Sequence, residues 1–279
     1  MKDADQRAFE RFLDEKDARN RDNVARTTSY LELYAFSRER GVELPWILMA
    51  HLVSRNAGYL MTDLGVALRE PDNVFTADAT RELFCFLERA NYLIFHDAWH
   101  HMLHHLLGRT SALGDETPRF MRDAWGRYES ALARGLDAAL ERSLVLDLVH
   151  NEQNLIESRV VHHARFDRAR AMVVFFEGVG REAPIVLPKT DARITVGGFV
   201  ELARRIDTGR RIFDTVLAPR SLRDEIFAWA MAHPHTGSRS AYTQKTRHQA
   251  TLRDVWKDDA VRASWPGIHA PPEPDPRWP

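Results

Sequence analysis

The chain has 279 residues, of which 44% are hydrophobic and 28% are charged, as in most folded globular proteins. Its 39 Lys and Arg residues balance 40 Asp and Glu residues, which argues against nucleic-acid binding. The single cysteine excludes an internal disulfide framework and a cysteine-based zinc site within one chain. The charged N-terminus lacks a secretory core, and no apolar run approaches the roughly 20 residues that span a bilayer, so we expect a cytoplasmic protein without a membrane segment.

Apolar residues recur at steps of three and four along most of the chain, which predicts a mainly α-helical protein. Pro45 suits a first helical turn, Thr76 suits an N-cap, and Gly108 suits a helix stop. The expected helices cover about residues 5–41, 45–68, 76–107, 119–163 (as one or two helices), 195–213 (with Thr195 as the N-cap) and 221–232.

The helical pattern weakens between residues 172 and 196. Apolar clusters at 173–176 and 185–187 flank two glycines, and they are typical either of a small β-hairpin or of a helix end. No linker or repeat divides the chain, so we expect a single-domain multi-helix bundle over residues 23–265. A charged helical extension, residues 1–22, would precede it, and a proline-rich tail, residues 266–279, would follow.

Polar residues share a stripe of the expected helix 45–68. They follow helical steps of three and four, and they are His51, Ser54, Arg55, Gly58 and Thr62. Because apolar residues crowd both flanks, the stripe either lines a cleft or faces solvent as a polar surface.

Glu152 lies one helical turn from both Leu148 and Ile156, which predicts a buried carboxylate. Burying a charge without a partner is costly, so this group needs an explanation. An ion pair with Arg55 or Arg159 is the structural interpretation. A catalytic or metal-binding carboxylate is the functional one.

Histidines crowd the segment 96–105. On a helix, Asp97 and His101 share the apolar side one turn apart, a spacing by which helical bundles hold iron, manganese or zinc with carboxylates from facing helices. Glu152 is the expected facing ligand, which gives a metal set of Asp97, His101 and Glu152. The alternative is that the histidines pack against other helices, because the segment has no His-Glu-x-x-His motif.

A polar loop follows the last long helix and contains His235, Ser238 and Arg239. Hydroxyls, a guanidinium and a glycine-permitted bend could hold an anion there. The alternative is a structural loop with a helix cap, since a single glycine is far from a phosphate-binding loop motif.

Several short segments together resemble an uncharacterised bacterial family, the YppC-like proteins, which carry a domain of unknown function. The segments are NVART (23–27) with Tyr30, AHLVSRN (50–56), MTDL (61–64), ERANYLIF (88–95), NEQN (151–154), IE (156–157), RV (159–160) and HTGSR (235–239). The resemblance implies one continuous domain, and it brings no activity with it.

Our leading hypothesis is an α-helical enzyme or small-ligand binder whose buried arginine, histidine and carboxylate groups act on an anionic substrate. The candidate catalytic residues are His51, Glu152 and Asp97, and the candidate ligand-binding residues are Arg26, Arg55, Arg159, His235, Ser238 and Arg239. One alternative is a non-catalytic protein that binds a protein partner and whose polar network only fixes helix register. Another is a diiron- or dimanganese-type helical metalloenzyme.

Overall fold

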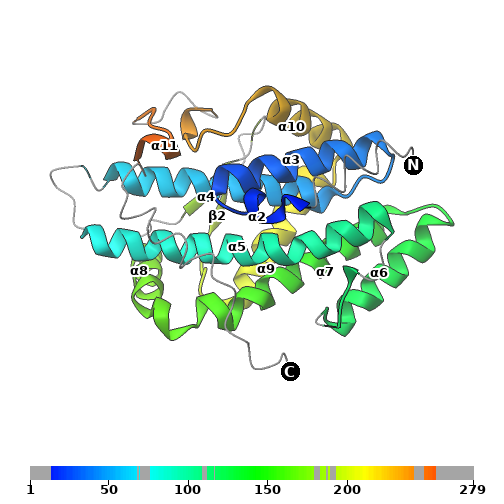
Figure 1. Cartoon of the computed structure of the whole chain (residues 1–279), viewed down its shortest axis with the longest axis horizontal. Helices are drawn as coiled ribbons and strands as arrows, with labels where there is room; N and C mark the ends of the chain where they lie inside the picture. The colour runs from blue at the N-terminus through cyan, green and yellow to red at the C-terminus, as the bar shows by residue number, and fades with distance from the viewer. Residues whose placement is uncertain are drawn as a thin grey trace.

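The computed structural model describes residues 14–67, 69, 76–108, 112–115, 117–178, 183–186, 188, 193–241 and 248–255. It is mainly α-helical, as the sequence predicts, and long helices make up most of the molecule (Figure 1). The elements are α2 (Lys16–Arg19), α3 (Asn23–Glu39), α4 (Pro45–Ala67), α5 (Ala77–Leu107), α6 (Arg119–Leu132), α7 (Ala138–Ile156), η2 (Glu157–Val161), η3 (Ala164–Phe166), α8 (Asp167–Gly178), β1 (Ala183–Val186), β2 (Arg193–Val196), α9 (Leu202–Ile212), η4 (Phe213–Leu217), α10 (Arg220–Ala232), η5 (Arg239–Ala241) and α11 (Leu252–Val255).

Side-chain caps and one glycine set the ends of the long helices. Asp22 accepts a hydrogen bond from Ala25 N at the start of α3, and Thr76 does the same for Ala79 N at the start of α5. Gly108 ends α5 in the left-handed conformation, with φ of 62°, which favours glycine. The predicted start and stop of α5 are therefore confirmed.

The region from α6 to β2 differs in detail from the sequence prediction. Residues 119–163 form two long helices, α6 and α7, followed by the π-helical turn η2. The apolar residues 173–176 belong to α8, which is the helix-end alternative, while the antiparallel hairpin pairs Ala183 with Val196 and Val186 with Arg193. The prediction of Thr195 as a helix cap was wrong, because Thr195 pairs with Pro184 inside β2.

Helix α5 carries both main parts of the core. Phe95, Trp99 and Met102 in its C-terminal half pack with α3, α4, α6 and α7, whereas Leu83 and Phe86 in its N-terminal half pack with η2 and α8. Figure 1 shows α5 running the length of the molecule below α3 and α4. This one helix therefore ties the two parts of the core together.

No helix in the described part of the chain is both long enough and apolar enough to cross a membrane. Most of the predicted N-terminal extension and all of the predicted proline-rich tail lie outside the described residues.

Candidate functional site: a pocket among five helices

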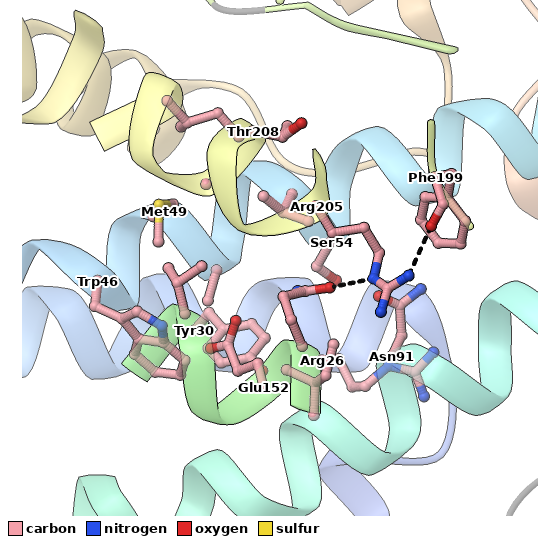
Figure 2. A pocket seen from close by; sticks show the side chains of 17 residues that line it. Arg26, Tyr30, Trp46, Met49, Ser54, Asn91, Glu152, Phe199, Arg205 and Thr208 are labelled. Atoms are coloured by element: carbon pink, nitrogen blue, oxygen red, sulfur yellow. Dashed lines mark hydrogen bonds between the residues drawn. The ribbon is translucent and has the colours of Figure 1, made fainter. Parts of the chain in front are cut away.

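A pocket of about 140 Å³ lies among α3, α4, α5, α7 and α9; we call it the central pocket (Figure 2). Most of its wall is apolar, and Val53, at 37% exposure, is its most exposed large apolar side chain. The lining residues are Arg26, Tyr30, Trp46, Met49, Ala50, Val53, Ser54, Asn91, Ile94, Val149, Glu152, Gln153, Phe199, Arg205, Thr208, Gly209 and Ile212. An apolar cavity with a few polar groups is the usual form of a small-molecule site.

Glu152 is the carboxyl group of this pocket. Its Oε1 is buried and has no hydrogen-bond partner within the described residues. Burial raises the pKa of Glu152 well above its usual value, the negative charge of Asp97 raises it further, and the indole N–H of Trp46 opposes the shift. That N–H makes no hydrogen bond of normal geometry in the described structure. Burial and the neighbouring charge therefore favour the neutral, proton-carrying form of Glu152.

Two buried arginines border the pocket, and each is paired with a carboxylate. Arg26 Nη2 lies 2.5 Å from Glu88 Oε2, and its Nη1 donates to Asn20 O at 2.9 Å. Arg205 Nη2 pairs with Glu157. These pairs fix α3 to α5 and α9 to η2, and they neutralise both guanidinium charges beside the pocket.

Arg205, on α9, also hydrogen-bonds two other residues of the pocket wall (Figure 2). Its Nε donates to Gln153 Oε1 at 3.0 Å and its Nη1 donates to Phe199 O at 2.8 Å. Gly209, one turn further along α9, lets that helix approach α7 closely, since a Cβ there would lie 2.7 Å from Val149 Cγ1. The α9 wall of the pocket is thus fixed by polar contacts at one turn and by a glycine at the next.

Asp97 and His101 lie beside Asn151, the residue that precedes Glu152 in α7. Asn151 donates to Asp97 Oδ2 at 2.6 Å, and His101 Nε2 lies 3.3 Å from the same oxygen. Burial opposes ionisation of Asp97, but these hydrogen bonds outweigh it and hold the pKa of Asp97 below its usual value. The surroundings thus favour the ionised form of Asp97 and the neutral form of Glu152, and opposite shifts of this kind divide base and acid roles in many active sites.

The same contacts do not form the predicted metal centre. His101 Nδ1 accepts a hydrogen bond from Trp125 Nε1 at 3.0 Å, so both ring nitrogens of His101 are occupied. Among the residues that the structure describes, no three His, Cys, Asp or Glu side chains are placed to hold a metal ion. The geometry therefore does not support the set of Asp97, His101 and Glu152. The buried rings of His101 and His104 contact Trp125 instead.

The polar stripe of α4 is buried, so the solvent-facing interpretation was wrong. His51 Nδ1 donates to Thr27 O at 2.8 Å, and Arg55 Nε donates to Tyr59 Oη at 2.7 Å. The guanidinium of Arg55 lies 4.5 Å from the Trp229 ring centroid, a cation–π contact with α10. Burial lowers the pKa of His51 to about 4, which leaves its imidazole neutral at pH 7.

The loop after α10 covers this stripe. His235 Nε2 lies 2.7 Å from Asn23 Oδ1, and burial lowers the pKa of His235 well below its usual value. Arg239 Nε donates to Asp63 Oδ2 at 2.5 Å, and Ser238 Oγ hydrogen-bonds Ser240 Oγ. These contacts attach the loop to α3 and α4.

The sequence-predicted site residues thus fall into separate places. Arg26 and Glu152 line the central pocket, whereas His51, Arg55 and His235 form a buried cluster that includes none of its lining residues. Arg159 lies in η2. Burial lowers the pKa of Arg89, and the positive charge of Arg159 lowers it further. The expected ion pair of Glu152 with Arg55 or Arg159 is absent from the described residues.

Sequence reasoning gave no pocket role to Trp46, Phe199, Arg205 or Gly209. In the sequence, Trp46 has the pattern of an ordinary core residue. The other three residues follow segment 172–196, where the helical pattern is weakest. Only a three-dimensional arrangement brings them to Glu152.

Comparisons with known proteins agree with the sequence resemblance. The family model described as "Protein of unknown function (DUF2515)" matches residues 18–117, which include the α3, α4 and α5 walls of the pocket. The "Uncharacterized protein YppC" of Bacillus subtilis (strain 168) is 28% identical over 240 residues, covering 79% of this chain and 68% of that protein. No solved structure matches. The chain is therefore similar over most of its length to the YppC-like proteins, a bacterial group of unknown function.

Proposed function

We propose that the central pocket binds a small molecule and that Glu152 is the group that acts on it, as a hydrogen-bond and proton donor. The observation that carries the proposal is the buried, unpartnered Oε1 of Glu152 in a mainly apolar pocket. A neutral carboxylic acid in such a place costs stability unless a bound group satisfies it. General acid catalysis needs a proton carrier of this kind.

Asp97 takes the second role in this proposal. Its negative charge helps to keep the proton on Glu152, because two neighbouring carboxylates repel each other. His51, one of the candidate catalytic residues, is assigned to the buried α4 cluster instead, since its Nδ1 is held by Thr27 O and it does not line the pocket. The location in this proposal remains the cytoplasm, because a single cysteine forms no disulfide within the chain and suits a reducing compartment.

A saturation-transfer NMR screen with uncharged single-ring compounds at millimolar concentration tests the proposal. Ala50 lies on the pocket wall, so Ala50→Met fills part of the cavity with a flexible, helix-compatible side chain. We expect compounds that bind the wild type to lose their signal with Ala50→Met.

Ala139→Met is the matched control, because Ala139 is exposed on α7 outside the pocket. It should leave binding unchanged. Circular dichroism melting of both variants verifies that they are folded. Compounds that bind Ala50→Met as well as they bind the wild type, or a screen without a single wild-type ligand, would contradict the proposal.

A further inference from the structure

The neutral carboxyl group of Glu152 presents two complementary hydrogen-bonding atoms side by side. A protonated carboxylic acid has one O–H donor and one carbonyl acceptor. Burial and the charge of Asp97 both favour this form. A ligand edge that offers one acceptor beside one donor would satisfy both atoms together.

The charges around the pocket are already balanced. Arg26 pairs with Glu88 and Arg205 pairs with Glu157, so each cation that lines the pocket has an anionic partner. An anionic ligand would lose its hydration on entering the pocket and would find no unpaired cation there to replace it. Its binding in a mainly apolar cavity is therefore unfavourable. These pairs favour an uncharged ligand over the anionic one expected from the arginines in the sequence.

Two further buried donors belong to residues that line the pocket, and they favour an acceptor on the ligand. Trp46 Nε1 and Arg26 Nε are buried, belong to lining residues, and have no hydrogen-bond partner within the described chain. A carbonyl oxygen has two lone pairs, so it can accept from Glu152 and also from the Trp46 N–H, which acts on the pKa of Glu152. An amide carbonyl is a strong acceptor of this type.

The size and walls of the pocket set the rest of the ligand. A cavity of about 140 Å³ is close in size to an engineered apolar cavity of about 150 Å³ that binds benzene. Tyr30 and Trp46 form an edge-to-face pair with ring centroids 6.2 Å apart, and Met49 and Phe199 add apolar surface. The space therefore suits one ring or an apolar group of equal size.

We infer that the central pocket takes an uncharged, ring-sized molecule with a carboxamide or lactam edge, which pairs with the carboxyl group of Glu152. This inference rests on the proposed function. The amide carbonyl accepts the Glu152 O–H, and the amide N–H donates to the carbonyl oxygen of the same group. No covalent step is involved.

Titration of the full-length protein with three probes of one shape tests the pairing. Benzamide has both the donor and the acceptor, acetophenone has the acceptor alone, and benzoate is anionic. Because a missing partner leaves a buried polar atom unpaired, we expect benzamide to bind about tenfold more tightly than either of the others.

Two substitutions separate hydrogen bonding from folding. Glu152→Gln keeps one donor and one acceptor in the same shape, so benzamide affinity should stay within about threefold of wild type. Glu152→Leu removes both and should weaken benzamide binding by about tenfold. Thermal melting verifies that each variant is folded.

Benzoate or acetophenone binding as tightly as benzamide would overturn the inference, as would benzamide binding that Glu152→Leu leaves unchanged. If these probes lose their signal with Ala50→Met, the pocket still binds small molecules and only the ligand class is wrong. Failure of all three probes also overturns the amide pairing, and the wider single-ring screen then judges the proposed function separately.

Discussion

The buried ion pair of Arg26 and Glu88 joins α3 to α5 beside the pocket and gives the sharpest stability prediction. Each side chain is 1% exposed, and Nη2 lies 2.5 Å from Oε2. Glu88→Gln keeps the shape but removes the negative charge, which leaves the Arg26 cation without its ion-pair partner. Breaking one side of a buried pair costs about 3–5 kcal/mol, a large share of the roughly 5–15 kcal/mol by which most domains are stable.

Urea unfolding followed by circular dichroism measures this loss as a lower midpoint at an unchanged slope. Asp123→Asn is the control, because Asp123 lies 3.9 Å from Arg119 in an exposed pair whose removal should leave the midpoint unchanged. The double variant Arg26→Met with Glu88→Met should recover much of the loss, since no buried charge remains. If Glu88→Gln unfolds at the same urea concentration as Asp123→Asn, the reasoning about this buried charge is refuted.

Two more predictions concern the buried cluster of α4. His51 has a folded pKa of about 4 against about 6.5 in an unfolded chain, so the unfolded state binds the extra proton and stability falls as pH drops from about 6.5 toward 4. His51→Gln should make that decline shallower in urea midpoints measured at pH 7 and pH 5; an equally steep decline would contradict the assignment. A Cβ on Gly58 would lie 2.3 Å from Asn23 Oδ1 and 2.7 Å from His235 Nε2, so we expect Gly58→Ala to cost about 1–3 kcal/mol. Gly126→Ala, whose Cβ meets nothing within 4 Å on α6, is the control, and equal melting temperatures for the two variants would refute the close approach.

Helix positions could be predicted from the sequence where local chemistry decides them. Thr76 and Gly108 mark the ends of α5 because capping and a left-handed stop depend on neighbouring residues alone. Thr195 shows the limit of this reasoning. A residue that suits an N-cap also suits a strand, and pairing with Pro184 across the hairpin decided between them.

The site was predictable only in part, for a related reason. The stripe around Glu152 indicated a buried carboxyl group, and the structure places it in a pocket. Its surroundings depend on which distant elements pack against α7. Arg205 illustrates this limit. The sequence of α9 is highly charged and gives no sign that one of its arginines is buried. In the structure, Arg205 is buried by its contacts with Glu157, Gln153 and Phe199 O.

The same limit explains why His51 and Glu152 were expected together. Both lie on helices with mixed polar and apolar faces, and a helical period gives the direction of each side chain relative to its own helix only. In the structure, α4 turns Trp46 and Met49 toward the pocket, while His51 hydrogen-bonds Thr27 O of α3. Helix α4 therefore contributes residues both to the central pocket and to the separate buried cluster around His51.

The protonation state of Glu152 is the central claim, and infrared difference spectroscopy measures it directly. The spectrum of the wild type minus that of Glu152→Gln at pH 7 isolates this one carboxyl group. Our account predicts the C=O stretch of a protonated carboxylic acid, which disappears only as pH rises well above the usual pKa of glutamate. A difference spectrum that shows only carboxylate bands at pH 7 would contradict it.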